Sequence, residues 1–159
     1  MVATSGDRLI ADDAVAILRE RLVPLAALLT PNLPEAGALL GEPTALSEDE
    51  MTSQGRRLLA LGCGAVLVKG GHGEGPDSVD ILFTAEGEIR LAAPRHATRN
   101  THGTGCTLSS AIAAGLAAGL ALEAAGRQAK AYLTQAIVAA DRLHIGSGSG
   151  PVHHFHRWW

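Results

Sequence analysis

The chain has 159 residues, of which 47% are hydrophobic and 18% are charged, and its formal net charge is -3 at pH 7. This balance is typical of a globular domain with its own core, and it excludes intrinsically disordered and collagen-like chains. Because the 13 basic residues are scattered and only 3% of residues are aromatic, the composition favours neither nucleic acid nor a membrane surface as a partner.

The cysteine content indicates a reducing compartment. Cys63 and Cys106 are the only two cysteines, too few for a disulfide framework or a four-cysteine zinc site. No stretch reads as a signal peptide, and the apolar run within residues 111–125 is too short and too rich in Ala and Gly to span a bilayer. We therefore expect a cytoplasmic protein.

The first part of the chain predicts a strand end, a helix and a short strand. Residues 1–3 are apolar and are followed by a turn, as at the end of a strand. Residues 25–29 predict a short buried strand that stops before Pro31. Between them, Asp12 or Asp13 is expected to cap a helix that ends before Pro24. Its apolar face would consist of Val15, Ile17, Leu18 and Leu22.

Two helices and a buried strand are predicted next. Residues 34–40 form a short helix with proline in its first turn and Gly41 as its end, and residues 47–61 begin with a Ser-x-x-Glu capping box. The apolar run 64–68 predicts a parallel strand covered on both faces. Residues 69–72, Lys-Gly-Gly-His, follow at its carboxyl end, where ligands bind in open α/β sheets.

The remaining pattern is a hairpin followed by two helices. Residues 78–83 and 88–92 flank a Thr-Ala-Glu-Gly turn, and helices are expected from about 104 to 118 and from 122 to 144. Strands alternating with helices predict a parallel, three-layered α/β fold. The predicted strands are too few to cover this many helices, so we infer that strands are missing.

The segment 98–119, which contains Gly103-Thr104-Gly105-Cys106, is the most informative part of the chain. The first N–H groups of a helix have no intrahelical acceptor, and two glycines allow a close approach of the main chain to a ligand. The helix dipole adds partial positive charge, so the segment predicts a site for a phosphate or an oxyanion. The same field favours the thiolate of Cys106, as a base or nucleophile. The alternative is an ordinary glycine-rich turn with a packed cysteine.

Other candidate residues also have two interpretations. Lys69 either binds an anion at the strand end or is simply solvated there, and Asn32 with Glu35 either contacts a ligand or caps a helix. His72 and His102 receive no catalytic role. Cys63 is expected to be a buried structural thiol.

The C-terminal residues are expected to have a structural role. A metal site is discounted for His153, His154 and His156, because their spacing fits no helix face and no other ligand cluster exists. Trp158 and Trp159 are expected to pack against the domain or a neighbouring subunit.

Five segments together resemble one known family. They are "LLTPNLPEAGALLG", "AVLVKGGHGEG", "DSVDILF", "RHATRNTHGTGCTLSSAIAAGLAAG" and "GSGSGPVHHFHRWW". In this order they are similar to the hydroxymethylpyrimidine/phosphomethylpyrimidine kinases of thiamine biosynthesis, in the ribokinase-like superfamily. Gly103-Thr104-Gly105-Cys106 stands where most of that superfamily has Gly-Ala-Gly-Asp. The resemblance implies that residues 1–159 form a single three-layer α/β kinase domain, truncated at its N-terminus, with a mostly parallel sheet and a hairpin at one edge.

The resemblance also implies an activity and a set of roles. ATP would phosphorylate 4-amino-5-hydroxymethyl-2-methylpyrimidine and then its monophosphate, with Mg²⁺ as cofactor and a homodimer as the family's assembly. Cys106 would be the base, Gly103, Thr104 and Gly105 the anion hole, and Lys69 the group that neutralises the phosphates. Gly70 and Gly71 would contact ATP. Asn32 and Glu35 would lie near the magnesium, and such a donor set suits Mg²⁺ because Mg²⁺ retains waters and phosphate oxygens as ligands.

One departure from the family pattern limits these expectations. The chain lacks the family's opening strand and Gly-rich segment, about the first two-fifths, and only Met1 and Val2 remain of the stretch that approaches the pyrimidine. We therefore expect weak or no kinase activity from this chain alone, and the homodimer becomes doubtful. The alternatives are a pyridoxal/pyridoxine kinase, and a non-catalytic fragment that binds nucleotide.

Overall fold

The computed structural model describes residues 11–71 and 75–159. These residues divide into two units. The first takes the described residues up to 71 together with Ser78–Ala92, and the second takes Gly75–Asp77 with Ala93–Trp159. The strand end predicted at residues 1–3 lies outside the described residues.

The first helical segment changes its helix type along its length. The α-helix α1 (Asp12–Ile17) continues into a π-helical stretch (Leu18–Leu22) and a 3₁₀ turn (Val23–Leu25) that contains Pro24. The α- and π-helical residues thus end at Leu22, before Pro24 as predicted, and the 3₁₀ turn follows as a separate element. Proline is tolerated there because the first turn of a helical segment leaves its N–H groups unpaired in any case.

The cap and the apolar face of α1 differ from the prediction. Ala11 is the N-cap without a side-chain capping bond, so the predicted cap at Asp12 or Asp13 is wrong. The carboxylate of Asp13 instead accepts a hydrogen bond from the N–H of the next residue at 2.8 Å. Ile17 and Leu22 are 59% and 57% exposed, whereas Val15 and Leu18 are half-buried and Val15 packs against the core, so only half of the predicted apolar face is covered.

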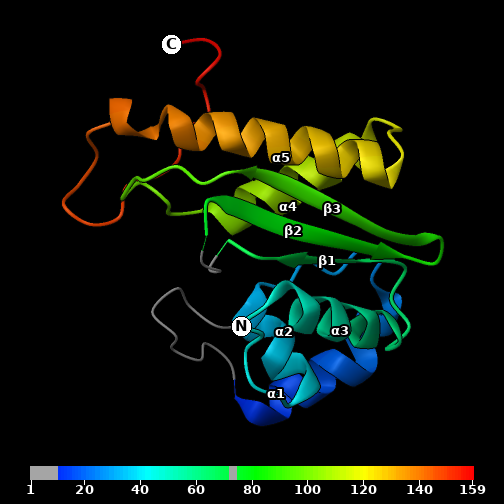
Figure 1. The fold of residues 1–159 in the computed structure, drawn as a ribbon. Coiled ribbons are helices and arrows are strands. Elements are labelled where there is room, and N and C mark those ends of the chain that lie inside the picture. The colour runs from blue at the N-terminus through cyan, green and yellow to red at the C-terminus, as the bar shows by residue number, and fades with distance from the viewer. Residues whose placement is uncertain (1–10, 72–74) are drawn as a thin grey trace. The chain divides into compact units, whose positions relative to one another are not determined.

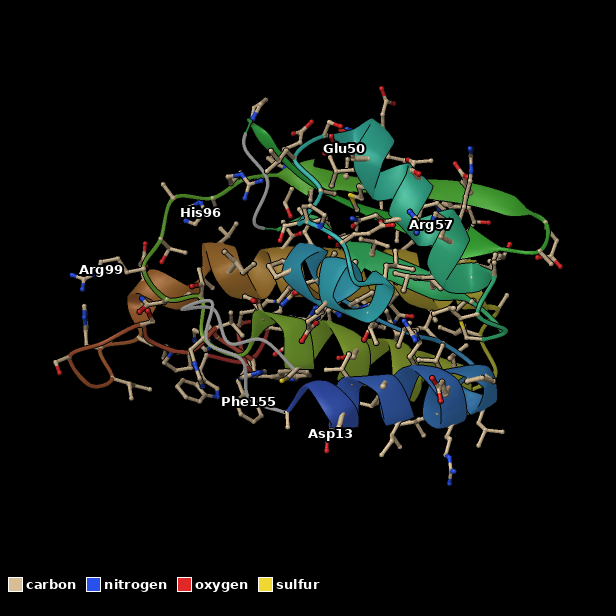
Figure 2. All side chains as sticks on the ribbon, turned by 90° about the horizontal axis from the view of Figure 1, so that it is seen from below. Asp13, Glu50, Arg57, His96, Arg99 and Phe155 are labelled. Atoms are coloured by element: carbon tan, nitrogen blue, oxygen red, sulfur yellow. The ribbon has the colours of Figure 1, made fainter. Side chains whose placement is uncertain are left out.

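The two helices that follow confirm the predicted local signals. The helix α2 (Leu33–Leu40) has proline in its first turn and ends at Gly41, whose φ of 72° places it in the left-handed region. The helix α3 (Glu48–Leu59) begins after Ser47, whose hydroxyl accepts the N–H of Glu50 at 3.2 Å. The carboxylate of Glu50 bonds elsewhere, so only half of the predicted capping box forms. Glu50 and Arg57 lie on exposed parts of α3 (Figure 2).

The sheet contains three strands in the order β1-β2-β3 (Figure 1). They are β1 (Val66–Lys69), β2 (Asp77–Thr84) and β3 (Gly87–Pro94), and the last two form the predicted hairpin. The strands β1 and β2 are antiparallel, with Lys69 opposite Asp80. This antiparallel pairing was not predicted, because a buried apolar run does not reveal the direction of its neighbour.

The predicted parallel pairing lies on the other edge of β1. There the N–H groups of Leu67 and Lys69 donate to the carbonyls of Leu29 and Pro31, at 2.7 and 2.8 Å. Isolated parallel bridges join Leu29 to Val66 and Asn32 to Lys69. Residues 25–29 nevertheless do not form the predicted strand, because the segment begins in the 3₁₀ turn and ends at Pro31, which has no N–H.

Helices α2 and α3 pack against β1 and form the core of the first unit. Val66 and Val68 are completely buried, and each such side chain contributes about 1.5–3 kcal/mol to folding. At Gly55 of α3, an added Cβ would lie 2.1 Å from the ring of Phe83, so only glycine permits this close approach. This packing fixes β1 and thereby the position of Lys69 at its end.

The second unit is built on two helices packed along each other (Figure 1). The helix α4 (Thr104–Ala117) ends within a residue of its prediction, and α5 (Leu122–Val138) follows it. At their contact, a Cβ on Gly115 would lie 3.0 Å from the Cβ of Ala125. The predicted end of the last helix at residue 144 is wrong, because the chain leaves α5 through a 3₁₀ turn at Ala140–Arg142. Among the described residues, no helix is both long and apolar enough to span a membrane.

Candidate active site

The N-terminus of α4 has the geometry that its sequence predicts. Gly103 is the N-cap with φ of 81°, and its carbonyl accepts the N–H of Thr107 at 2.8 Å. The N–H of Thr104 reaches the carbonyl of Thr101 only at 3.4 Å. No hydrogen bond within residues 11–71 and 75–159 uses the N–H of Gly105 or of Cys106. Two backbone donors are therefore unpaired at the positive end of a helix of 14 residues.

The two cysteines differ as predicted. Cys106 is exposed in the first turn of α4, beside the unpaired donors, so the alternative in which it packs as a small apolar residue is wrong. Cys63 is only 6% exposed, and burial raises the pKa of its thiol. Cys106 is thus the thiol of this chain that a reactant can approach.

Contacts from distant parts of the second unit hold the loop before α4. The side-chain amide of Asn100 donates to the carbonyl of Ala140 at 3.2 Å and to Asp141 at 3.0 Å. The N–H of His102 donates to the carbonyl of Gly150 at 3.0 Å. An added Cβ at Gly150 would lie 2.1 Å from the side-chain oxygen of Asn100, which explains why glycine occupies this position. Sequence reasoning missed these residues, although the glycine-rich run at 146–150 indicates that the main chain there lies close to another segment.

The loop itself also carries a cation. Arg99 is exposed and extends from the segment that leads into α4 (Figure 2).

The C-terminal segment packs beside the first turn of α4. Nε2 of His154 lies 3.0 Å from the hydroxyl of Thr107, and the hydroxyl of Tyr132 donates to the carbonyl of His154 at 2.9 Å. Cys106, Thr107, Tyr132, His154 and Arg157 line one end of a groove of about 640 Å³. Cys106 therefore opens onto a groove within its own unit.

The C-terminal histidines and tryptophans have separate environments. His153 is 2% exposed and packs against the ring of Trp159, whereas His156 contacts Gln135 at 3.1 Å. Within the described ranges, no group of three or more His, Cys, Asp or Glu side chains could hold a metal. Trp158 and Trp159 are 72% and 67% exposed, so their predicted packing is limited to contacts with His153 and Phe155.

Lys69 lies at the carboxyl end of β1, in the first unit. It is half-buried, with Asn32 bridged to it on one side and Asp80 opposite it on the other. The N–H of the following Gly70 donates to Oδ1 of Asp80 at 3.0 Å. A Cβ at Gly70 would lie 2.1 Å from the carbonyl oxygen of Val79. At the exposed Gly71, an added Cβ would have no atom of the described residues within 4 Å. Asp80 was not singled out by sequence reasoning.

Asn32 and Glu35 form a reciprocal capping box on α2. Oδ1 of Asn32 accepts the N–H of Glu35 at 2.8 Å, and Oε2 of Glu35 accepts the N–H of Asn32 at 2.9 Å. The capping interpretation of this pair is therefore confirmed. The box also fixes the position of the Glu35 carboxylate at the start of α2.

Three residues singled out in the sequence have no structural description. Met1, Val2 and His72 lie outside the described residues. Lys69 and Cys106, the two proposed reactive side chains, belong to different units of the chain.

The sequence matches the family described as phosphomethylpyrimidine kinase over residues 1–153. It is 57% identical over 159 residues to the hydroxymethylpyrimidine/phosphomethylpyrimidine kinase of Escherichia coli K12 and 58% identical to that of Rhizobium meliloti. Each alignment covers 100% of this chain and 60% of the relative. The chain thus spans about three-fifths of the length of these relatives.

Two solved structures that resemble the chain are also kinases. A pyridoxal kinase from Bacillus subtilis, in an ADP complex, superimposes with a TM-score of 0.86 at 34% identity, over 92% of this chain and 56% of that one. The phosphomethylpyrimidine kinase of Clostridium difficile superimposes with a TM-score of 0.71 at 38% identity, over 86% of this chain and 54% of that one. These likenesses confirm the predicted ribokinase-like α/β fold. With the family match over residues 1–153, they establish that the chain belongs to the phosphomethylpyrimidine kinase family.

Proposed function

We propose that this chain carries the phosphoryl-binding part of an ATP-dependent kinase for 4-amino-5-hydroxymethyl-2-methylpyrimidine and its monophosphate. The observation that carries the proposal is the unpaired N–H pair of Gly105 and Cys106 at the start of α4, beside an exposed thiol. Relatives of this family are named for that activity, and its members match the chain along its full length.

The chemistry follows from the needs of phosphoryl transfer. The transition state is loose, so positioning and charge stabilisation contribute more than a strong base. The thiolate of Cys106 takes the proton of the substrate hydroxyl, and the alcohol oxygen bonds to the γ-phosphorus as the bond to the bridging oxygen of ADP breaks. The N–H groups of Gly105 and Cys106, with Gly103 and Thr104 shaping the turn, hold the transferring group. Lys69, followed by Gly70 and Gly71, neutralises the nucleotide phosphates.

Asn32 and Glu35 are the residues that would hold Mg²⁺. Their donor set of one amide oxygen and one carboxylate fits Mg²⁺, which is bound through one or two carboxylates, with waters and phosphate oxygens as its other ligands. When bound, the ion neutralises charge on the β- and γ-phosphates. Glu35→Gln keeps an acceptor for the N–H of Asn32, so we expect the fold to persist while magnesium no longer strengthens ATP binding. An unchanged magnesium dependence would contradict this assignment.

The nucleotide is the ligand with the most direct support. Two pyridoxal kinases similar to this chain are described in complex with ADP and with AMP-PCP. Because the chain spans 60% of its relatives, we expect the 159-residue polypeptide to bind ATP but to turn over slowly by itself. Met1 and Val2 remain proposed contacts of the pyrimidine ring.

Calorimetric titration of the purified chain with ATP tests the binding, and coupled detection of ADP release tests the transfer. We expect saturable ATP binding, and ADP release far below that of a full-length relative with the pyrimidine alcohol. Absence of ATP binding would refute the proposed function. Turnover equal to that of a full-length relative would refute the expectation of weak activity.

Pyridoxal phosphorylation is the second candidate, because pyridoxal kinases superimpose on the chain with TM-scores up to 0.90. Comparing ADP release with the pyrimidine alcohol and with pyridoxal, in the same assay, distinguishes the two activities. ATP binding without release on either alcohol would favour the nucleotide-binding fragment. Native mass spectrometry of the same sample tests the homodimer.

A further inference from the structure

Asp80 is a buried acidic residue that the proposed mechanism does not use. It lies in β2, is only 3% exposed, and stands opposite Lys69 in the β1–β2 register. Burying a carboxylate is costly unless hydrogen bonds compensate it. Its Oδ1 accepts the N–H of Gly70 at 3.0 Å, so the carboxylate is bonded to the backbone of the turn that directly follows Lys69.

That turn is held tightly on the side of β2. A Cβ at Gly70 would lie 2.1 Å from the carbonyl oxygen of Val79, so the main chain of Gly70 contacts β2 directly. On the other edge of β1, the N–H of Lys69 donates to the carbonyl of Pro31 at 2.8 Å. The backbone on both sides of the Lys69 Cα is therefore fixed, by Pro31 before it and by Asp80 after it.

We propose that Asp80 is a positioning residue for phosphate binding by Lys69. Its carboxylate fixes the Gly70 N–H and thereby the direction in which the chain leaves β1 after Lys69, so that the lysine meets the nucleotide phosphates without rearrangement. A hydrogen bond to a charged acceptor is stronger than a neutral one, which suits an acidic residue for this task. The inference rests on the phosphate role proposed for Lys69.

Two variants of Asp80 and one control separate positioning from general stability. Asp80→Ala removes the acceptor, whereas Asp80→Asn keeps an oxygen at the same place. Ile81→Ala deletes a neighbouring side chain of β2 that is 5% exposed and does not contact the turn by hydrogen bonding. We expect ATP affinity to fall about tenfold in Asp80→Ala, in keeping with the loss of a hydrogen bond to a charged group. Asp80→Asn and Ile81→Ala should stay within about threefold of the wild type.

Two further readouts complete the test. The amide proton of Gly70, followed in proton–nitrogen correlation spectra, should shift upfield and exchange faster in Asp80→Ala but not in Ile81→Ala. In a Lys69→Ala background, Asp80→Ala should weaken ATP binding by less than about twofold, because the group that it positions is gone.

The outcomes distinguish this inference from the proposed function. If the wild type binds ATP and Lys69→Ala weakens it, but Asp80→Ala does not, the positioning role is wrong and the proposed function stands. Equal losses in Asp80→Asn and Asp80→Ala, or losses that add to that of Lys69→Ala, would also overturn it. If the wild-type chain binds no ATP, the proposed function fails and this inference fails with it.

Discussion

The hydroxyl of Thr107 lies 3.0 Å from Nε2 of His154. Thr107 directly follows the proposed base, and His154 lies 47 positions further along the chain. Thr107 is 9% exposed, so most of this residue is shielded from solvent. The contact attaches the C-terminal segment to the first turn of α4, where the unpaired N–H groups lie.

This contact predicts a measurable contribution to stability. Thr107→Val keeps the shape of the side chain but removes the hydroxyl, and we expect the free energy of unfolding in urea to fall by about 1 kcal/mol. Thr134→Val is the matched control, because within the described parts of the chain the hydroxyl of Thr134 bonds only to the Lys130 carbonyl of its own helix. A larger loss in the control than in Thr107→Val would contradict the prediction.

The exposure of Cys106 predicts selective alkylation. In the native chain, iodoacetamide should modify Cys106 and leave Cys63 unmodified, since burial shields Cys63 and raises the pKa of its thiol. Saturating ATP should slow the reaction at Cys106, because the proposed phosphate site adjoins it. Mass spectrometry of the digested protein measures both sites. Labelling of Cys106 that ATP does not slow would argue against phosphate binding at this helix end.

Gly70 and Gly71 should respond very differently to substitution. Gly70→Ala places a methyl group against the Val79 carbonyl, so we expect the unfolding free energy to fall by about 1–3 kcal/mol and ATP binding to weaken. The added Cβ of Gly71→Ala has no atom of the described residues within 4 Å, so the unfolding free energy should stay within about 0.5 kcal/mol of the wild type. Chemical denaturation of the two variants decides the matter. Equal effects would show that the turn is not pressed against β2.

Glu48 predicts a small pH-dependent contribution to stability. Hydrogen bonds from Arg90, at 2.9 and 3.0 Å, lower the pKa of the Glu48 carboxyl from its usual value. Because the pKa of Glu48 is lower in the folded state than its unfolded value of about 4.3, the ionised carboxylate stabilises the fold at pH values above that unfolded value. This stabilisation is lost as the pH falls through the folded-state pKa. Both side chains are about half exposed, so Glu48→Gln should cost less than about 1 kcal/mol near neutral pH.

The control for that prediction is Asp49→Asn in the same first turn of α3, which shares the helix dipole but not the arginine. Urea unfolding at neutral pH and below about pH 3 should show the Glu48→Gln deficit disappearing in acid. A deficit that persists in acid would show that the effect does not come from the charge of Glu48.

The sequence predicted best those elements whose causes are local. The capping box of Asn32 and Glu35, the left-handed Gly41 and the Gly103 start of α4 each depend on neighbours within a few residues. The helix end and exposed thiol at Cys106 were predictable for the same reason. The activity came from the resemblance of whole segments to a family and not from periodicity.

What sequence reasoning missed depends on contacts between distant residues. Asp80 lies ten residues from Gly70, and only the antiparallel pairing of β1 with β2 brings the two together. Asn100 is held by residues about 40 positions away. Residues 25–29 were predicted as a strand from their apolar composition, which gives no warning of the 3₁₀ turn that absorbs Leu25.

The pairing of β1 on both of its sides has a consequence for assembly. Since residues 26–31 and β2 already hydrogen-bond to β1 on its two sides, β1 has no open edge for a strand from another polypeptide. Among the described residues, β3 is the outer strand on one side of the sheet, and residues 26–31 flank β1 on the other side through isolated bridges. A polypeptide that extends this sheet must therefore pair with the outer edge of β3 or lie beyond residues 26–31. The strand β1, which carries Lys69, would then remain in the interior of the sheet.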